Sequence, residues 1–478
     1  MEPSFFNNRK WLFWALLFSS IGILFHHAHQ EGFFLDGYTY AVLGKNIAAS
    51  GNGLVPFYTK FIHARFHDHI PFVFVLEALF FKAFGVSYLT ARVFIGLFSL
   101  ALVLGIFIYL QHLKLYSQAF LASFWLLASF PFLKQSRFPN PDIPLTFFSL
   151  VSLYAFYEAV RSGHRRYWFV AGLCLSFAMF SKGPMAIFVP ITWSVYLFSL
   201  RDLKTLSSFR FWLTLIGAAS LFCVWPALLF YTHNEDIWFG YLNHTFLYSI
   251  KESRGLIHNE LGLYLKYLLL YCAPQVFLGV FAVVRFFTSQ RQDNFIRLNI
   301  IFVGVVLSLC SVMKFKYSHY IMPVYPSLAF LAACGMTELK DWNWNKLLLP
   351  ITIVVALILV AIPMTFLNQR DEELLTIIKK LKTENINSKL DWINLRDAYG
   401  FWEISGLVAF ELGTTVYPSE EKRISFVLAN TLKTHRAIVV MKDSENIDSS
   451  SLRIVESLGR YSKKHIKAYI VEIIPDPF

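Results

Sequence analysis

The stretch ARFHDHIPFVF places His67, Asp68 and His69 directly before an apolar run. Imidazoles and carboxylates can bind a divalent cation, transfer protons or hydrogen-bond to phosphate. Two more acids, Asp36 and Asp142, each stand at the start of a segment with a helical pattern. An acid in that position either caps the helix N-terminus or acts on a substrate as a general base, and the sequence alone leaves both roles open.

Basic residues occupy two short connections between apolar runs. FSKGPM carries Lys182 before a Gly-Pro turn, and KFKYSHYIMPVYP carries Lys314, Lys316 and His319. A lysine in so short a connection lies near the membrane interface, where it either extends to water or holds an anionic group. The second cluster falls on the side where basic residues are usually scarce, which predicts an anionic membrane substrate such as a lipid phosphate.

Membrane helices must position these residues. The chain has 478 residues, of which 56% are hydrophobic and 15% are charged, whereas a soluble domain carries about 25% charged residues. Apolar runs long enough to cross the hydrocarbon core recur up to residue 367, which predicts a multi-pass protein of the lipid bilayer. The net charge of +12 comes largely from Lys and Arg in the connections between apolar runs. Cytoplasmic loops of membrane proteins are rich in these residues, so the charge does not indicate a nucleic-acid partner.

The number and direction of the crossings follow from run length and charge. We expect about eleven transmembrane helices. The run 71–86 is short and carries Glu77 and Lys82. If it crossed, Arg9 and Lys10 would lie opposite the other basic connections, so we interpret it as an interfacial helix and place the C-terminus outside. The candidate spans are 11–27, 89–111, 117–133, 143–160, 167–181, 184–200, 210–231, 262–284, 298–314, 318–336 and 347–367.

This topology brings several polar stretches to the outer face. Ionisable groups at the edge of a membrane domain usually line a cavity or a substrate pathway. The stretches are 28–70, 134–142, 181–184, 232–260 and 314–319. Other ionisable residues on these loops are expected to be ordinary solvated positions; they are His26, His27, His29, Lys45, Lys60 and Glu260.

The composition changes after Leu367, where charged residues become frequent. RAIVVMK (436–442) and IKAYIVEII (466–474) predict strands. We therefore expect residues 1–368 to form a transmembrane domain and residues 369–478 to form a small soluble α/β domain outside the cytoplasm. The five cysteines all lie in apolar runs without paired spacing, which predicts free thiols instead of disulfides or a zinc site.

Several of these segments, in this order, carry a known pattern. They are FLDGYTYAVLGKNIAASGNGLVP, FGVSYLTAR, PDIPLTFFSLVSLYAFYEA, AGLCLSFAMFSKGP, and the K-x3-Y-x2-P-x2-P pattern of Lys316, Tyr320, Pro323 and Pro326. With them the chain resembles the bacterial membrane glycosyltransferases of the GT-C fold. More narrowly, it is similar to the family of the aminoarabinose lipid A transferase and its protein-mannosyltransferase-like relatives. The resemblance covers residues 10–340.

The resemblance implies a fold class and a reaction. The fold is an all-α polytopic membrane protein of GT-C type, with interfacial helices beside the spans and the small C-terminal soluble α/β domain. The donor is a sugar carried on a polyprenyl phosphate, usually undecaprenyl phosphate in bacteria. The acceptor is lipid A, another glycolipid or a glycan, and the active site faces the periplasm at the bacterial plasma (inner) membrane. The sugar would be transferred with inversion at C1.

The resemblance also assigns residues. Asp36 and Asp142 match the family's acids of the first and second outer loops, and His244 falls where relatives carry a histidine that joins an acid at a metal. Relatives typically have an acid-Lys-Pro-Pro element where this chain has DHIP, residues 68–71. Two interpretations of this departure stay open. Either His69 replaces the lysine as a phosphate ligand, with help from Arg65, or Asp68 or a neighbouring histidine joins His244 in binding a divalent cation such as Zn²⁺.

The predicted chemistry is attack at C1 of the sugar with polyprenyl phosphate as the leaving group. Cations and hydrogen-bond donors would stabilise the developing charge on the phosphate. If the acceptor is a hydroxyl, Asp36 is expected to take its proton. If the acceptor is a phosphate, Asp36 would orient groups or hold a metal, and Asp142 would support the site through Arg137. The expected phosphate ligands are Arg65, His69, Lys182, Lys314, Lys316 and Tyr320, with Lys251 and Arg254 as further candidates.

Two other classes of function fit a hydrophobic chain with a polar outer face. One is a transporter or flippase for an anionic lipid-linked substrate, although the sequence has no obvious internal repeat of the kind transporters often carry. The other is an inactive glycosyltransferase relative that serves as a scaffold. Loss of turnover in a folded Asp36→Ala variant would identify an enzyme, whereas a scaffold would keep its partner.

Overall fold

The computed structural model describes residues 9–34, 36–59, 63–247, 262–289, 292–314 and 316–339, and the C-terminal segments 375–376, 391–394, 406–413, 416–418, 436–442, 452–461 and 466–473. The chain divides into two compact units. Unit 1 comprises Met1–Ala28, His67–Val73 and Arg92–Met364, and unit 2 comprises His29–Phe66, Phe74–Ala91 and Thr365–Phe478. The predicted division at residue 368 stays a prediction, because that residue lies outside the described segments.

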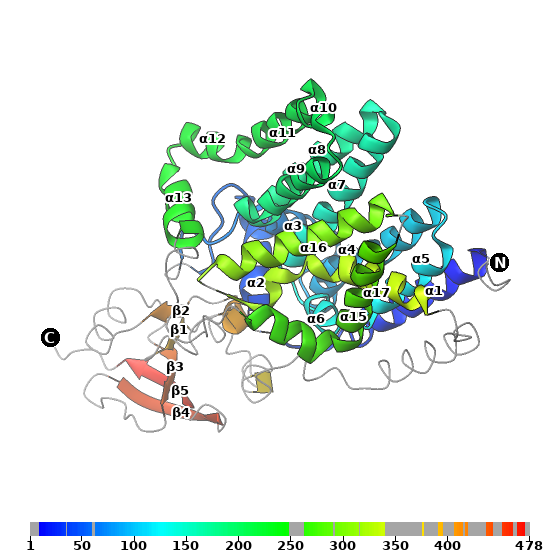
Figure 1. Ribbon diagram of the computed structural model, residues 1–478. Helices are drawn as coiled ribbons and strands as arrows, with labels where there is room; N and C mark the ends of the chain where they lie inside the picture. Colours follow the sequence, from blue (N-terminus) through cyan, green and yellow to red (C-terminus); the bar gives the residue numbers. More distant parts are fainter. Residues whose placement is uncertain are drawn as a thin grey trace. The chain divides into compact units, whose positions relative to one another are not determined.

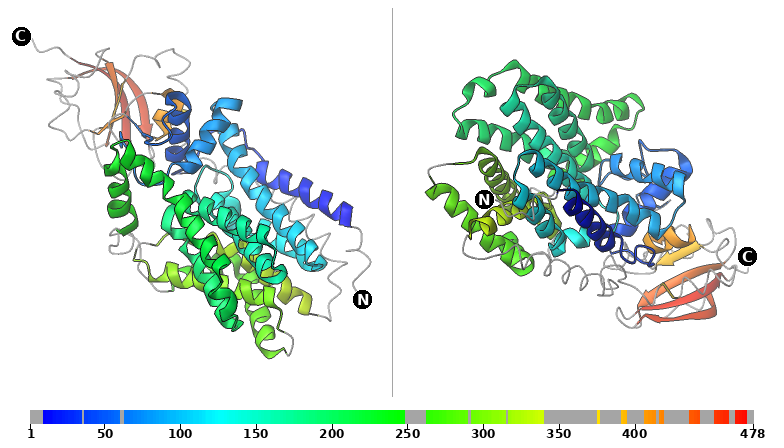
Figure 2. Two further views of the ribbon diagram at one scale, coloured as in Figure 1. Left: turned by 90° about the horizontal axis from the view of Figure 1, so that it is seen from above. Right: turned by 90° about the vertical axis from the view of Figure 1, so that its right-hand side faces the viewer.

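Unit 1 is helical, as its long apolar runs predict. Its helices pack side by side in a bundle; α1 is dark blue and the later helices run from light blue to yellow-green in Figures 1 and 2. In chain order the elements are α1 (Arg9–Phe25), α4 (Tyr88–His112), α5 (Tyr116–Leu127), α6 (Phe130–Gln135), α7 (Asp142–Ser162), α8 (Arg165–Lys182), η2 (Gly183–Ile187), α9 (Phe188–Ser199), α10 (Leu203–Leu206), α11 (Phe209–Phe222), α12 (Val224–Tyr231), α13 (Glu235–Gly240), η3 (Tyr241–Leu247), α15 (Leu263–Thr288), α16 (Asn294–Val312), η4 (Ser318–Ile321) and α17 (Val324–Glu338).

Six helical stretches of the described residues are long and apolar enough to cross a membrane. They are Tyr88–His112, Asp142–Ser162, Arg165–Ser199, Phe209–Tyr231, Leu263–Thr288 and Asn294–Val312. The protein is therefore a multi-pass membrane protein, as predicted. The number of about eleven crossings stays a prediction, because the expected span 347–367 lies outside the described residues.

The chain reverses direction at Gly183. Phe156 of α7 stacks on Trp193 at 4.8 Å between ring centroids and meets Trp168 edge-on at 5.8 Å. Two residues 25 positions apart in a straight helix would lie nearly 40 Å apart, so α8 and α9 must fold back on each other. Gly183 has φ +63°, a left-handed conformation that only glycine adopts readily. This is the tight reversal predicted from FSKGP.

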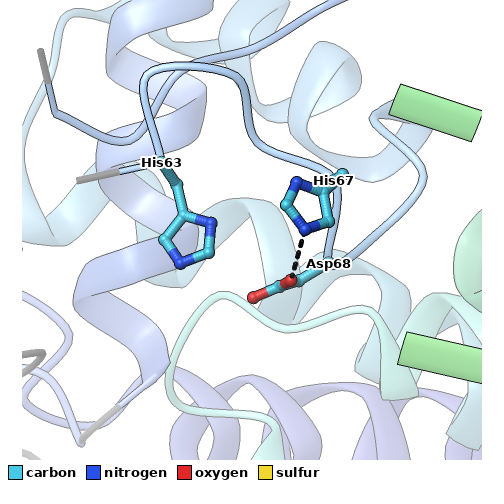
Figure 3. A group of neighbouring side chains, drawn as sticks. All are labelled: His63, His67 and Asp68. Carbon is cyan, nitrogen blue, oxygen red and sulfur yellow. Dashed lines mark ion pairs between the residues drawn. The ribbon is translucent and has the colours of Figure 1, made fainter. Parts of the chain in front are cut away.

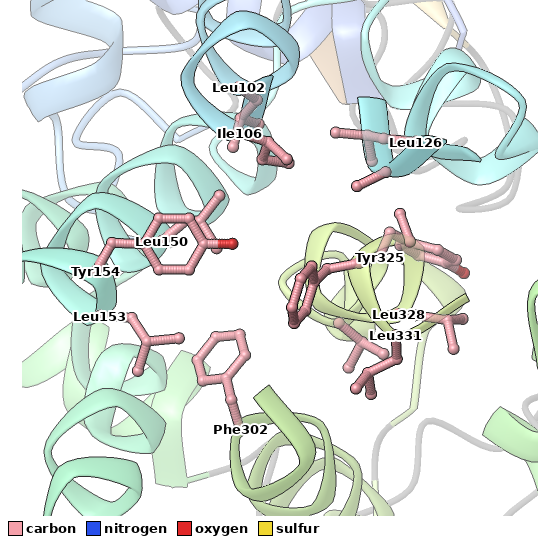
Figure 4. Close-up of a cluster of buried hydrophobic side chains, with 14 of the residues drawn as sticks. Leu102, Ile106, Leu126, Leu150, Leu153, Tyr154, Phe302, Tyr325, Leu328 and Leu331 are labelled. Atoms are coloured by element: carbon pink, nitrogen blue, oxygen red, sulfur yellow. The ribbon is translucent and has the colours of Figure 1, made fainter. Parts of the chain in front are cut away.

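The core of unit 1 is formed by large apolar side chains from several helices. Figure 4 shows such side chains of α4, α5, α7, α16 and α17 pointing toward one another. Close helix approach depends on small residues, as is typical of membrane bundles. A Cβ on Gly335 of α17 would lie 2.1 Å from the carbonyl oxygen of Leu278 in α15, so glycine is required there.

Unit 2 contains α2 (Asp36–Ser50), most of α3 (Phe72–Phe84) and a five-stranded sheet. The strands are β1 (Asp391–Asn394), β2 (Val416–Pro418), β3 (Arg436–Lys442), β4 (Leu452–Tyr461) and β5 (Ile466–Ile473), in the order β2-β1-β3-β5-β4. β1 pairs in parallel with β2 and β3, whereas β5 pairs antiparallel with β3 and β4. Strands therefore occur at both predicted positions, and the α/β character of the whole segment 369–478 stays a prediction.

Lys45 of α2 is not the solvated loop residue that the sequence indicated. Its ammonium group donates to the carbonyl oxygens of Ala409 at 2.9 Å and Phe410 at 2.7 Å, within a short helix at 406–412. The last carbonyls of a helix carry partial negative charge, which a lysine stabilises. The Phe410 ring also packs on Tyr88, with centroids 5.0 Å apart. Lys45 therefore joins α2 to the C-terminal segment within unit 2.

The helix predicted at 71–86 is present as α3, and its placement at the membrane interface stays a prediction. Its Glu77 is fully buried against Gly44 of α2, where a Cβ would lie 3.0 Å from the carboxyl oxygen. Both carboxyl oxygens lack a hydrogen-bond partner among the described residues, and burial raises the pKa of Glu77. The side chain packs α3 against α2, and its burial favours the neutral form of the acid.

Candidate functional site

The predicted residues Asp142 and Lys182 meet in unit 1. Asp142 is the first residue of α7 and Lys182 is the last residue of α8, and these two helices pack closely together as antiparallel neighbours. Lys182 Nζ lies 2.5 Å from Asp142 Oδ1, and the two side chains are only 8% and 6% exposed. The same ammonium group lies 4.7 Å from the ring centroid of Tyr320, which is a cation–π contact.

Asn140 performs the capping role that the sequence left open for Asp142. Its Oδ1 accepts hydrogen bonds from the backbone N–H groups of Asp142 at 3.0 Å and Ile143 at 3.1 Å. Its Nδ2 donates to the carbonyl oxygens of Gln135 and Phe138 at 2.6 and 2.7 Å. Because Asn140 satisfies the N-terminal amides of α7, the carboxylate of Asp142 is available to Lys182. The sequence reasoning overlooked Asn140, although Asn-x-Asp before an apolar run is a capping signal.

Arg137, through which Asp142 was expected to support the site, hydrogen-bonds to the backbone at the end of α1. Its guanidinium donates to the carbonyl oxygens of Ile23, Leu24 and His26 at the end of α1. A guanidinium suits that position because helix C-terminal carbonyls attract cations. Burial lowers the pKa of Arg137 to about 10, which still leaves it charged at neutral pH. Arg137 therefore anchors the connection that precedes Asp142 to α1.

Two histidines, His69 and His319, lie within the electrostatic reach of the ion pair. Burial and the nearby Lys182 ammonium lower the pKa of His69 to about 4, against the opposing effect of Asp68 and Asp142. Burial also lowers the pKa of His319 to about 4; Asp142 opposes this shift, while Lys182, His69 and Lys134 add to it. Both imidazoles are therefore neutral at pH 7 and can donate or accept hydrogen bonds. Lys134 had not been singled out in the sequence.

The connection before α17 carries the other predicted basic residues. Lys316 is buried, with 3% of its surface exposed, whereas Lys314 is exposed. His319 stacks on Tyr317 with ring centroids 5.1 Å apart and meets Tyr320 edge-on at 5.0 Å. This aromatic packing orients the imidazole and holds the Tyr320 ring in contact with the ammonium group of Lys182. Lys314 is the least enclosed of the expected phosphate ligands on this connection.

The turn 182–183, the segment 67–70 and the start of η3 converge by close contact. A Cβ on Gly183 would lie 1.8 Å from the hydroxyl oxygen of Tyr241 and 3.3 Å from Ile70 Cδ1. A Cβ on Gly240 would lie 3.0 Å from the His67 ring. η3 is a π-helix, a rare form that often occurs at functional sites. Its backbone carries His244, whose side chain lies outside the described part of the chain.

His67 and Asp68 are the described donors for the predicted cation site. Figure 3 shows the two side chains facing each other, with His67 Nε2 3.8 Å from Asp68 Oδ1. Two ligands of one tetrahedral Zn²⁺ are separated by roughly 3.3 Å, so this spacing needs only a small adjustment to hold the ion. Imidazole and carboxylate are suitable donors, and the pair supplies two of the four ligands that such a site takes. The metal site stays a prediction.

Asp36 and Arg65 belong to unit 2. Asp36 is the exposed first residue of α2, where a carboxylate is favoured by the helix dipole. Burial raises the pKa of the neighbouring Tyr58, and the charge of Asp36 adds to that shift. Arg65 is exposed. The role of Asp36 as a base therefore stays a prediction, and its exposure leaves the carboxylate accessible to a substrate.

Comparison with known proteins finds sequence similarity to membrane glycosyltransferases. Residues 68–230 match the family model described as dolichyl-phosphate-mannose-protein mannosyltransferase. The undecaprenyl phosphate-alpha-4-amino-4-deoxy-L-arabinose arabinosyl transferase of Pseudomonas aeruginosa (strain UCBPP-PA14) is 24% identical over 339 residues, which cover 68% of this chain and 60% of that protein. An uncharacterized protein of Aquifex aeolicus (strain VF5) is 26% identical over 297 residues, 62% of this chain and 57% of its own length. The chain thus spans less than two thirds of these relatives.

A solved structure shares the fold. The crystal structure of ArnT from Cupriavidus metallidurans bound to undecaprenyl phosphate matches with a TM-score of 0.74 at 15% identity, over 97% of this chain and 98% of that one. The sequence had indicated the same family from its ordered motifs. The chain is thus similar in sequence to this mannosyltransferase family over residues 68–230 and to the arabinosyl transferases over a longer stretch, and it shares the fold of the solved ArnT structure.

Proposed function

We propose that the protein transfers a sugar from an undecaprenyl-phosphate donor to a lipid or glycan acceptor at the outer face of the bacterial inner membrane. The observation that carries this proposal is the enclosed Lys182–Asp142 pair with the neutral His69 and His319 beside it. A lysine almost shielded from water binds an anion more strongly than a solvated one does. The name of the Pseudomonas relative and the ligand of the ArnT structure supply the donor class.

The leaving phosphate would compete with Asp142 for Lys182. As negative charge develops on the phosphate, the ammonium group stabilises it, and the imidazole N–H groups of His69 and His319 add hydrogen bonds. Lys316 and Tyr320 complete the enclosed part of this site, and Lys314 is an exposed ligand for the same charge. Arg65, which is exposed in unit 2, stays a predicted phosphate ligand. This reading uses His69 as the phosphate ligand in place of the family's lysine.

Deprotonation of the acceptor would require a carboxylate that a substrate can reach. Asp36 suits this role because it is exposed at the start of α2. If a divalent cation is bound, Asp68 and His67 would hold it, and it would supply positive charge to the phosphate. In this proposal the active site faces the periplasm, residues 1–368 form the transmembrane domain, and residues 369–478 lie on the same outer side.

The test is turnover by the purified protein in detergent. We would incubate it with a panel of undecaprenyl-phosphate-linked sugars and a bacterial lipid extract, and detect released undecaprenyl phosphate and the modified acceptor by mass spectrometry. Asp36→Ala and Lys182→Met should each lower turnover by about a hundredfold or more. Lys204→Met, an exposed lysine of α10, is the matched control and should keep wild-type turnover. Failure of the folded wild type to use any donor, while an ArnT protein works alongside, would overturn the proposal.

A further inference from the structure

Three aromatic side chains form a compact group against the turn that follows Lys182, and we call them the aromatic triad. Trp225 of α12, Trp238 of α13 and Tyr241 of η3 each contact the other two. The ring centroids of Trp225 lie 5.9 Å from Trp238 and 6.1 Å from Tyr241, and Trp238 stacks on Tyr241 at 5.9 Å with an interplanar angle of 29°. None of the three belongs to the main hydrophobic cluster of the described residues.

The triad is fixed to the segments that form the phosphate site. The hydroxyl of Tyr241 lies against Gly183, the residue after Lys182, so closely that a Cβ there would be 1.8 Å away. Gly240, between Trp238 and Tyr241, packs against the ring of His67. The triad therefore packs on the backbone of the turn that carries Lys182, whose ammonium group we assign to the donor phosphate.

Exposure within the triad is uneven. Trp225 and Tyr241 are buried, at 6% and 4% exposed, whereas Trp238 keeps part of its surface accessible. Tryptophans at the edge of a membrane protein commonly serve as interfacial anchors whose rings face the lipid headgroups. Trp212 of α11, with 51% of its surface exposed, fits that description, but the two buried members of the triad do not. Buried rings hold Trp238 in one orientation, as a binding surface requires.

The chemistry of the donor indicates what this surface would contact. In a polyprenyl-phosphate sugar, C1 is bonded to a phosphate oxygen, so the sugar ring must lie directly beside the bound phosphate. The C–H groups on one face of a sugar ring are apolar and pack on the electron-rich face of an aromatic ring. We propose that the aromatic triad is the sugar subsite of the donor, with Trp238 contacting the transferred ring. This inference rests on the proposed function.

The experiment compares two ligands that differ only in the sugar. We would measure the binding of undecaprenyl phosphate, and of the undecaprenyl-phosphate-linked sugar that the wild type turns over, beginning with 4-amino-4-deoxy-L-arabinose. Trp238→Ala should raise the dissociation constant of the sugar-linked ligand by about tenfold, which corresponds to the loss of one aromatic contact. It should raise the dissociation constant of undecaprenyl phosphate by less than about twofold. Trp238→Phe keeps an aromatic face, so its affinity for the sugar-linked ligand should fall by no more than about threefold. Trp212→Ala is the matched control and should bind both ligands as the wild type does.

The outcomes separate this inference from the function on which it rests. Equal weakening of both ligands by Trp238→Ala, or no weakening of either, would overturn the sugar subsite. The same loss in Trp212→Ala would assign both tryptophans to the lipid interface instead. If the wild type transfers a sugar and Trp238→Ala binds the donor normally, only the subsite is wrong. If the wild type binds neither ligand, the proposed function fails together with it.

Discussion

The Lys182–Asp142 pair allows a quantitative test of the site. We consider Lys182→Met, Asp142→Asn and the double variant. At 2.5 Å two unit charges attract by about 7 kcal/mol at an effective dielectric constant of about 20. The cost of removing both groups from water offsets much of this attraction, so the net stabilisation by the pair is smaller. Removing one partner leaves the other charge enclosed, which costs about 3–5 kcal/mol.

The two single variants should differ. Asp142→Asn leaves the ammonium group of Lys182 enclosed near His69 and His319, with its closest negative charge gone. Lys182→Met leaves the carboxylate of Asp142, which raises the pKa of both His69 and His319, so a histidine can take up a proton and compensate the enclosed charge. Lys182→Met should therefore be the less destabilised of the two. The double variant removes both enclosed charges. Its stability should therefore exceed that of Asp142→Asn.

The assay is thermal unfolding in detergent, followed by intrinsic fluorescence, together with turnover. Arg285→Met is the matched control, because Arg285 and Glu338 form an exposed pair at 3.5 Å that should contribute under about 1 kcal/mol. All three variants at Lys182 and Asp142 should lose turnover, including the double variant whose stability recovers. A double variant whose loss equals the sum of the two single losses would refute the reasoning, since the two charges would then be independent.

Three further predictions concern the same region. Gly183→Ala should prevent stable folding, because its Cβ would overlap the Tyr241 hydroxyl, whereas Gly163→Ala, with φ +70° and open space around it, should cost only about 1 kcal/mol in thermal unfolding. Asn140→Ala should lower turnover and stability by removing the cap of α7. Asn140→Asp keeps both acceptor bonds but loses the two bonds that Nδ2 donates to Gln135 and Phe138, so it should also be destabilised; an Asn140→Ala variant as stable and active as the wild type would contradict the capping role. The folded-state pKa of His319, about 4, lies below its ordinary value of 6.5, so its contribution to stability is present above pH 6.5 and is lost as the pH falls toward 4. His319→Gln should therefore show a shallower fall in melting temperature between pH 7 and pH 5 than the wild type, and identical slopes would show that His319 does not contribute.

The sequence by itself determined the class of protein and most of its helices. The hydropathy of a run depends only on its own residues, so the long apolar helices and the turn at Lys182 and Gly183 could be read directly. The ordered motifs also indicated the resemblance to GT-C glycosyltransferases, because such motifs are matches of residue type and spacing along the chain. The same local reasoning found strands at 436–442 and 466–474, where β3 and β5 lie.

The pairing of side chains was decided by the tertiary structure. Asp142 and Lys182 are 40 residues apart, and nothing in either motif indicated that they form one ion pair. Asp142 was expected to support the site through Arg137, but the guanidinium of Arg137 donates to carbonyl oxygens at the end of α1, 111 to 114 residues away in the sequence. Lys45 was expected to be solvated and caps a helix at 406–412 instead.

The same distinction applies to the residues that the sequence reasoning missed. Asn140 and Tyr241 are polar or aromatic residues of common type, and their roles depend on which backbone each one meets. Gly183 shows both sides: its place in a Gly-Pro turn predicts the reversal, but its contact with Tyr241 exists only after α8 and η3 have packed together. The sequence pattern of a segment specifies whether it forms a helix, a strand or a turn, because hydrophobicity and backbone preference are properties of that segment alone. Contacts between distant segments depend on packing of the whole unit, and the charges and hydrogen bonds of the site follow from those contacts.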